Sequence, residues 1–171
     1  MWQTIINSFD QAVTMLSANV YWLTLSYLLL SEFGAPIPLP GNMVLVAGGF
    51  LLGQSSQVPL LLMALAFAAL VPGAITLYWV GRQGGIPLLE RIGSKIGLPP
   101  DRREKITRWL DKRAISGLIV LRLLPTVRVG TTILPGALGM PWSRYVVGMG
   151  SALIAWVVTY IGIGYLIGLN V

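Results

Sequence analysis

The segment Leu121-Arg122-Leu123-Leu124-Pro125-Thr126-Val127-Arg128 places two arginines around a proline within otherwise apolar sequence. A charged side chain at the centre of a membrane helix costs roughly 2.5–3.5 kcal/mol, so it must be buried in protein, line a polar cavity or bind a ligand. Residues six apart on an unbroken helix lie about 120° from each other. Pro125 breaks or kinks the helix, which lets both guanidinium groups face one polar space. Such a pair suits a phosphate, because arginine offers planar, bidentate donors.

The composition around this segment is that of a membrane protein. Of the 171 residues, 55% are hydrophobic and 11% are charged, whereas a soluble domain carries about 25% charged residues. Residues 33–81 and 145–171 contain no formal charge. Because a spanning helix needs about 20 apolar residues, we expect an all-α, multi-pass membrane protein. The first residues lack a basic region and a cleavage site, so we do not expect a removable signal peptide.

The charged and reactive residues exclude several classes of function. The chain has no His and no Cys, which excludes disulfides, thiolate nucleophiles and the commonest metal ligand. Nine of the twelve basic residues lie between Arg82 and Arg113, and the positive-inside rule predicts that this segment is cytoplasmic. We do not expect nucleic-acid binding, because the basic cluster lies between membrane segments.

The hydrophobic pattern predicts one membrane domain over residues 1–171 that consists of two halves. In each half an interrupted hydrophobic segment precedes a long apolar one, as in inverted repeats with two opposed re-entrant helical hairpins and spanning helices. The predicted parts are an interfacial helix at 1–17, a first half at 18–82 with a hairpin near 34–53, a cytoplasmic basic segment at 83–113, and a second half at 114–171 with a hairpin near 114–140.

Prolines and glycines mark the expected breaks within these halves. We expect Pro36, Pro38, Pro40, Gly41 and Pro125 to shape the hairpin tips, because alternating prolines do not continue a helix. The first long segment, 58–81, should end at Arg82, and the arm 129–140 should be interrupted at Pro135-Gly136. The last helix, 142–169, carries five glycines that permit close packing: Gly148, Gly150, Gly162, Gly164 and Gly168.

Three segments together resemble the signatures of the DedA family, whose core is the VTT domain. The first runs from Glu32 to Gly49 and includes Pro36-Ile-Pro-Leu-Pro-Gly-Asn42; the second is Gly73-Ala-Ile-Thr-Leu-Tyr78-Trp-Val-Gly81-Arg82. The third is the double-arginine segment, followed by Pro135-Gly-Ala-Leu-Gly-Met140. They occur in the family's order and cover roughly residues 30–160.

The resemblance implies a polytopic protein of the bacterial cytoplasmic membrane with two opposed re-entrant hairpins. It also implies lipid translocation, and some bacterial members are undecaprenyl phosphate transporters, several of them thought to be driven by protons. The family's acidic residue corresponds to Glu32, and its paired arginines correspond to Arg122 and Arg128. Two titratable positions of the family are Asn42 and Ala74 here, which weakens the case for proton coupling.

We therefore expect Arg122, Arg128, Glu32 and Asn42 to form the substrate site. The arginines would bind the phosphate headgroup, although they could instead form structural ion pairs with Glu32. Glu32 could exchange a proton or pair with an arginine in the empty site. Asn42 can donate a hydrogen bond but cannot titrate.

The leading hypothesis is a flippase for polyprenyl (undecaprenyl) phosphate, bound by the paired arginines between the hairpins. The alternative is a general phospholipid scramblase without energy coupling. An enzyme acting on lipid phosphates is disfavoured, because His, Cys and an embedded carboxylate pair are all absent from the sequence. The expected partners are membrane lipids, no cofactor is predicted, and the sequence leaves a homo-oligomer open.

Overall fold

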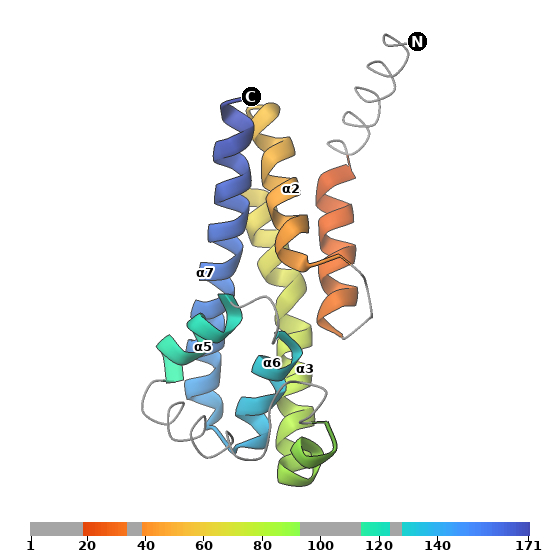
Figure 1. Cartoon of the computed structure of the whole chain (residues 1–171), viewed down its shortest axis with the longest axis vertical. Coiled ribbons are helices and arrows are strands. Elements are labelled where there is room, and N and C mark those ends of the chain that lie inside the picture. The colour runs from red at the N-terminus through yellow and green to blue at the C-terminus, as the bar shows by residue number, and fades with distance from the viewer. Residues whose placement is uncertain (1–18, 34–38, 93–113, 124–127) are drawn as a thin grey trace. The chain divides into compact units, whose positions relative to one another are not determined.

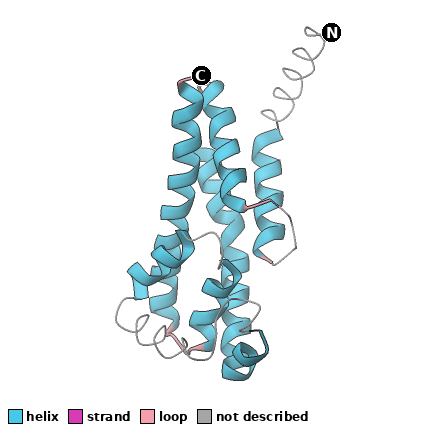
Figure 2. Ribbon diagram, in the orientation of Figure 1, coloured by secondary structure: helices cyan, strands magenta, loops and turns pink. Residues whose placement is uncertain are grey.

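Helices are the regular secondary structure in the described part of the chain. The computed structural model describes residues 19–33, 39–92, 114–123 and 128–171, and strands are absent from these ranges (Figure 1, Figure 2). The helices are one over residues 19–32, α2 (Gly41–Gln54), α3 (Leu60–Ile92), α5 (Ala114–Leu123), α6 (Arg128–Ala137) and α7 (Trp142–Leu169). The all-α prediction is confirmed.

Two of these helices are long and apolar enough to cross a membrane. They are Leu60–Leu88 within α3 and Trp142–Leu169, which is the whole of α7. Large apolar side chains lie exposed along the helices, among them Trp22 at 71% and Leu166 at 62%. Such surfaces suit a lipid environment, in which an exposed apolar side chain carries no hydration cost.

The chain divides into two compact units, and α3 and α7 contribute to both. The first unit holds the described residues 19–31, 39–69 and 157–171. The second holds residues 32–33, 70–92, 114–123 and 128–156. The predicted division of one membrane domain into an interfacial helix, two halves and a basic segment stays a prediction.

In the first unit, the helix over residues 19–32 and α2 form a helical hairpin. The hydroxyl of Tyr27 donates a hydrogen bond to the carbonyl of Leu39, just before α2 begins. Further along α2, a Cβ on Gly48 would lie 3.3 Å from Oγ1 of Thr24 and 3.5 Å from Cγ2 of Val20. The two arms therefore pack closely along their length.

Glycines bring α2 against the C-terminal part of α7. A Cβ on Gly49 would lie 2.2 Å from the carbonyl oxygen of Ile161. In return, a Cβ on Gly164 would lie 2.0 Å from the carbonyl oxygen of Val46. Real Cβ atoms do not approach a carbonyl this closely, so the contact requires glycine on both helices.

The second unit repeats this arrangement with α5, α6 and α3. Helices α5 and α6 form a pair in contact. A Cβ on Gly81 of α3 would lie 2.2 Å from the carbonyl oxygen of Ile133, and one on Gly136 of α6 would lie 2.0 Å from that of Tyr78. The second arm of each hairpin therefore packs on a long helix through glycine.

Three expectations about these helices were wrong in detail. Helix α3 does not end at Arg82; it continues to Ile92 with a kink at Gly85, whose φ of 53° and ψ of −151° are not helical. An exposed arginine keeps its backbone N–H, so it does not stop a helix, whereas the positive φ of Gly85 kinks α3.

The other two differences concern Pro135 and two glycines of α7. Pro135 lies inside α6 and does not interrupt it; the following turn is closed by hydrogen bonds from the N–H of Leu138 to the carbonyl of Leu134 and from that of Met140 to Pro135. Apart from the backbone of α7 itself, no heavy atom of the described chain lies within 4 Å of a Cβ added at Gly150 or Gly162, so neither glycine mediates close packing there.

Candidate functional site

Glu32 supplies a buried carboxylate to the second unit. It is helical and lies at the end of residues 19–32, and only 2% of it is exposed. Gly73 of α3 makes the room for it, since a Cβ there would lie 2.4 Å from Cγ and 2.8 Å from Cβ of Glu32. A buried carboxylate is costly unless it is paired and hydrogen-bonded.

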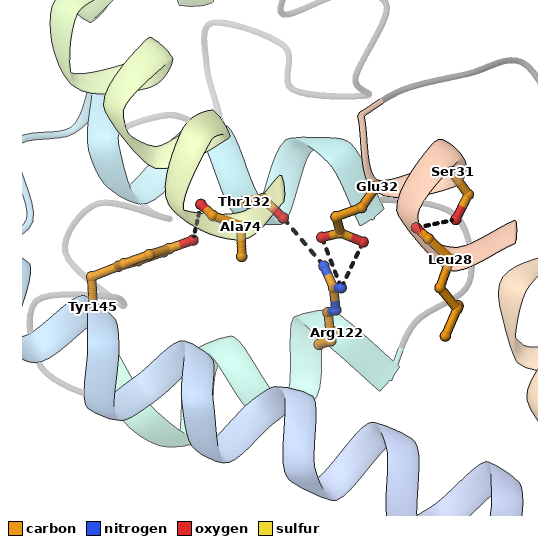
Figure 3. Close-up of polar contacts among 7 residues, drawn as sticks. All are labelled: Leu28, Ser31, Glu32, Ala74, Arg122, Thr132 and Tyr145. Carbon is orange, nitrogen blue, oxygen red and sulfur yellow. Dashed lines mark hydrogen bonds and ion pairs between the residues drawn. The ribbon is translucent and has the colours of Figure 1, made fainter. Parts of the chain in front are cut away.

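Arg122 provides the pairing charge from the last turn of α5. Its Nη2 lies 2.9 Å from Oε1 and 3.0 Å from Oε2 of Glu32, so one nitrogen donates to both carboxylate oxygens (Figure 3). The two residues are 90 positions apart in the sequence. The fold thus satisfies two buried charges by bringing them together.

Two further side chains hold the guanidinium group of Arg122. Its Nη1 donates a hydrogen bond to Oγ1 of Thr132 on α6, at 3.2 Å (Figure 3). Its Cζ lies 5.6 Å from the ring centroid of Trp156 on α7, which is within cation–π range. Thr132 and Trp156 are 0% and 4% exposed, so Arg122 is enclosed.

One donor of Arg122 has no acceptor among the described residues. The Nε atom is buried and makes no hydrogen bond in the described part of the chain. Buried donors without an acceptor are uncommon in folded proteins, because each costs about 1–3 kcal/mol. An enclosed guanidinium with a spare N–H has the chemistry to bind an additional anionic oxygen.

Tyr145 closes the neighbouring part of the second unit. Its hydroxyl donates a 2.8 Å hydrogen bond to the carbonyl of Ala74, which follows Gly73 on α3 (Figure 3). Ala74 is 3% exposed. This hydrogen bond joins a side chain of α7 to the backbone of α3. Position 74 itself carries no titratable side chain, because it is alanine.

The other predicted site residues are not part of this cluster as described. Arg128 is the first residue of α6, and its side chain lies outside the described structure, as do Pro36, Pro38 and Pro125. Pro40 has extended backbone, with φ −68° and ψ 134°, and α2 begins at Gly41 directly after it. The structure thus describes the helix start but does not test the expected shaping of the tips.

Asn42 lies in the first unit, on the wall of an apolar groove. The groove has a volume of about 310 Å³ and is formed by α2 and α7; its lining residues are Asn42, Met43, Val46, Ala47, Phe50 and Ile167. Asn42 belongs to a different compact unit from Glu32 and Arg122. Its assignment to the substrate site stays a prediction.

Sequence reasoning missed Gly73, Thr132 and Trp156. Gly73 lies between Pro72 and Ala74. A glycine there permits another segment to pack closely on the helix, but the sequence does not indicate which segment does so. Thr132 lies four residues after Arg128, a spacing that pairs neighbouring positions on a helix. Trp156 carried no signal, because one aromatic residue in an apolar helix is ordinary core.

Comparison of the sequence with known protein families assigns the chain to a family. The family model of the VTT domain matches residues 39–166, which is more than half of the chain. The chain belongs to the VTT domain family. The match covers both candidate spans up to residue 166 and includes Arg122 and Thr132, whereas Glu32 precedes it.

Curated VTT relatives are distant in sequence. An undecaprenyl phosphate transporter A of Bacillus subtilis is 26% identical over 133 residues, covering 76% of this chain and 66% of its own length. A membrane protein of Synechocystis without an assigned function is 27% identical over 135 residues, covering 78% and 62%. The chain thus spans slightly less than two thirds of both relatives.

Other comparisons add a differently named relative. A Lactococcus lactis protein named alkaline phosphatase-like protein is 25% identical over 138 residues, covering 78% of this chain and 64% of its own length. No solved structure matches this chain. The findings identify a VTT-family membrane protein with two candidate spans.

Proposed function

We propose that this protein translocates undecaprenyl phosphate, or a similar polyprenyl phosphate, across the bacterial cytoplasmic membrane. The observation that carries the proposal is Arg122, which is enclosed, paired with one carboxylate and left with a buried Nε donor that has no acceptor in the described chain. Membership of the VTT family and the printed name of the Bacillus subtilis relative support a phosphate-bearing lipid as substrate.

In this proposal Glu32 occupies the position of the substrate anion until the substrate arrives. Both carboxylate oxygens accept hydrogen bonds from Nη2 of Arg122, so Glu32 occupies a donor that a phosphate oxygen would use. A phosphate that enters would displace Glu32 and use Nη2 together with the unpaired Nε. The exchange trades one paired anion for another, so Arg122 never loses its counter-charge in the apolar interior.

Arg128 would supply the second cation of the headgroup site. Arg128 begins α6 and lies six residues after Arg122, with Pro125 between the two arginines. A phosphate monoester carries about 1.5–2 negative charges at neutral pH, so two arginines neutralise it better than one. We further propose that the two helical hairpins are re-entrant and form an inverted repeat, which the matching glycine contacts of the two units support.

A scramblase without energy coupling is the second candidate. Glu32 is the one acidic residue in the sequence ranges 18–88 and 114–171, and position 74 is a buried alanine whose carbonyl is used by Tyr145. Proton-driven transport would therefore depend on Glu32, which would take up a proton when the phosphate displaces it. Uncoupled exchange needs no such step.

Transport is also proposed in preference to phosphate-ester hydrolysis. The sequence contains no His or Cys, and the described residues hold no group of three or more acidic, His or Cys side chains. Among the described residues, the groups that bond to or stack with Arg122 are one carboxylate, one hydroxyl and one indole ring. This set binds an anion but lacks a second carboxylate or a His for proton transfer to a leaving group.

The test is translocation in proteoliposomes. Polyprenyl phosphate is added to the outer leaflet, and an impermeant phosphatase then removes the phosphate from molecules that have not crossed, so the protected fraction measures transport. Arg122→Lys keeps the charge opposite Glu32 but loses the guanidinium fork, and we expect at least about a tenfold slower rate. Arg144→Lys is the matched control, because Arg144 is exposed and makes no hydrogen bond or ion pair in the described chain.

The same assay separates the alternatives. A rate for Arg122→Lys equal to that of the unmodified protein would reject the proposed site, provided that both proteins are monodisperse. Equal transport of polyprenyl phosphate and phosphatidylcholine, without dependence on a pH gradient, would favour the scramblase. Release of inorganic phosphate without added phosphatase would indicate an enzyme.

A further inference from the structure

Four aromatic rings form a cluster on α3 and the first turn of α7, and they belong to Tyr78, Trp79, Trp142 and Tyr145. Tyr78 stacks on Tyr145 at 4.3 Å between ring centroids, and Trp142 lies 5.0 Å from Tyr78 and 5.8 Å from Trp79. The two tyrosines are buried, whereas Trp79 is 45% and Trp142 is 38% exposed. The cluster therefore presents two indole rings on its outer side.

Arg82 is fastened to this cluster by one edge of its guanidinium group. Its Nη1 donates hydrogen bonds to the hydroxyl of Tyr78 at 3.3 Å and to the carbonyl of Met140 at 3.2 Å. The Tyr78 hydroxyl donates to the same carbonyl at 2.6 Å. The Met140 carbonyl thus fixes both side chains, and Tyr78 is itself fully buried.

The other edge of Arg82 is open. The residue is exposed, and Nε and Nη2 have no acceptor in the described part of the chain. Arg82 lies three residues after Trp79, which puts the two on one face of α3. A guanidinium that is held in place on one side and free on the other offers a prepared fork for a phosphate.

The position of Arg82 along the chain indicates which lipid surface it meets. It is the first of the nine basic residues that extend to Arg113, the segment that the positive-inside rule predicts to be cytoplasmic. The cytoplasmic leaflet carries anionic lipids, and indole rings favour the headgroup level of a bilayer. Charge complementarity therefore selects an anionic phospholipid.

We infer that Arg82, together with Trp79 and Trp142, binds the phosphate headgroup of an anionic phospholipid in the cytoplasmic leaflet. The phosphate oxygens accept hydrogen bonds from Nε and Nη2 of Arg82, and the upper part of the acyl chains lies against the two indole rings. The bound lipid lies beside the hydrogen bond from the Arg82 side chain to the carbonyl of Met140, the residue that precedes Pro141 and α7. This site is separate from Arg122 and does not depend on the proposed transport function.

Quenching of tryptophan fluorescence by brominated lipids tests the inference. The full chain is placed in nanodiscs that hold one protomer, with dibrominated phosphatidylglycerol or dibrominated phosphatidylcholine in an unlabelled phosphatidylcholine background. The relative association of the anionic over the zwitterionic lipid is measured for the unmodified protein, Arg82→Gln, Arg82→Lys and Arg144→Gln. Arg144→Gln removes the same charge from an exposed side chain that makes no hydrogen bond or ion pair in the described chain.

We expect the preference for phosphatidylglycerol to fall about fivefold in Arg82→Gln and to stay unchanged in Arg144→Gln. Arg82→Lys should keep part of it, because lysine retains the charge but not the fork. Equal preferences in Arg82→Gln and the unmodified protein would overturn the inference. Equal losses in Arg82→Gln and Arg144→Gln would also overturn it, because the lipid preference would then depend on net charge alone. A preference seen only when two protomers share a nanodisc would overturn it as well.

A second variant tests the site even if Arg82→Gln does not fold. The double variant Trp79→Phe/Trp142→Phe removes the two indoles of this site and leaves Arg82 in place, so the excess quenching by dibrominated phosphatidylglycerol should disappear. Retention of the whole quenching excess by this variant would place the lipid elsewhere and contradict the site.

Discussion

In the first unit, α2 packs on the C-terminal part of α7, and in the second unit, α6 packs on α3. Each contact is a pair of glycines that would collide with a carbonyl of the opposite helix if either carried a Cβ; the pairs are Gly49 with Gly164, and Gly81 with Gly136. The long helix that follows each hairpin thus receives the second arm of the other hairpin. The two units share one packing rule.

Charge separates the two units completely among described residues. All twelve Lys and Arg residues of the sequence fall between Arg82 and Arg144, within the range of the second unit. The described side chains of the first unit include no charged one, and Asn42 on its groove is neutral. Packing geometry is therefore common to both units, whereas anion chemistry is confined to one.

Removal of one member of the ion pair should give the largest difference between the units. Glu32→Ala or Arg122→Ala leaves a buried charge without its partner, and we expect a loss of about 3–5 kcal/mol in the free energy of unfolding. The double variant Glu32→Ala/Arg122→Ala should lose less than the sum of the two. Reversible SDS titration followed by circular dichroism measures all three, with Asn42→Ala as the control in the uncharged unit.

A purely additive cycle would contradict this account of the pair. It would mean that Glu32 and Arg122, at 2.9 Å, contribute independently to stability. Additivity is normal for distant residues and fails for residues in direct contact.

The sequence predicted the charged partners but not their surroundings. A lone acid and an arginine beside a proline are conspicuous in an apolar chain, because burial of either is costly without the other. Thr132 and Trp156 are ordinary residues of membrane helices, and their contact with Arg122 depends on how α6 and α7 pack. Helix ends were predicted least well, since Pro135 remains within α6 and Arg82 remains within α3.

Glycine-to-alanine substitution should affect both units equally and by a smaller amount. Gly164→Ala in the first unit and Gly136→Ala in the second each place a Cβ 2.0 Å from a backbone carbonyl oxygen, and we expect each to lose about 1–3 kcal/mol. Gly150→Ala and Gly162→Ala are the matched controls within α7, because nothing lies within 4 Å of their added Cβ. Those controls should keep or slightly raise stability, since alanine favours helix. A large loss in one unit alone would show that the shared packing rule does not hold.

The smallest predicted effect compares two buried threonines. Thr132→Val removes the acceptor for Nη1 of Arg122 and leaves the shape of the side chain unchanged, so we expect a loss of about 1–2 kcal/mol. Thr24→Val in the first unit, where Thr24 is also 2% exposed, should cost less, because no described charged side chain lies in that unit. Thermal unfolding of both variants in the same detergent gives the comparison.

The pair of threonines also tells apart two explanations of the second unit. If Thr132 matters because it holds a buried guanidinium, its cost should disappear in the Arg122→Ala background, where no Nη1 needs an acceptor. If Thr132 matters for packing of α5 on α6, its cost should persist there. Equal costs for Thr132→Val with and without Arg122 would therefore remove Thr132 from the anion site and leave it as a core residue, like Thr24.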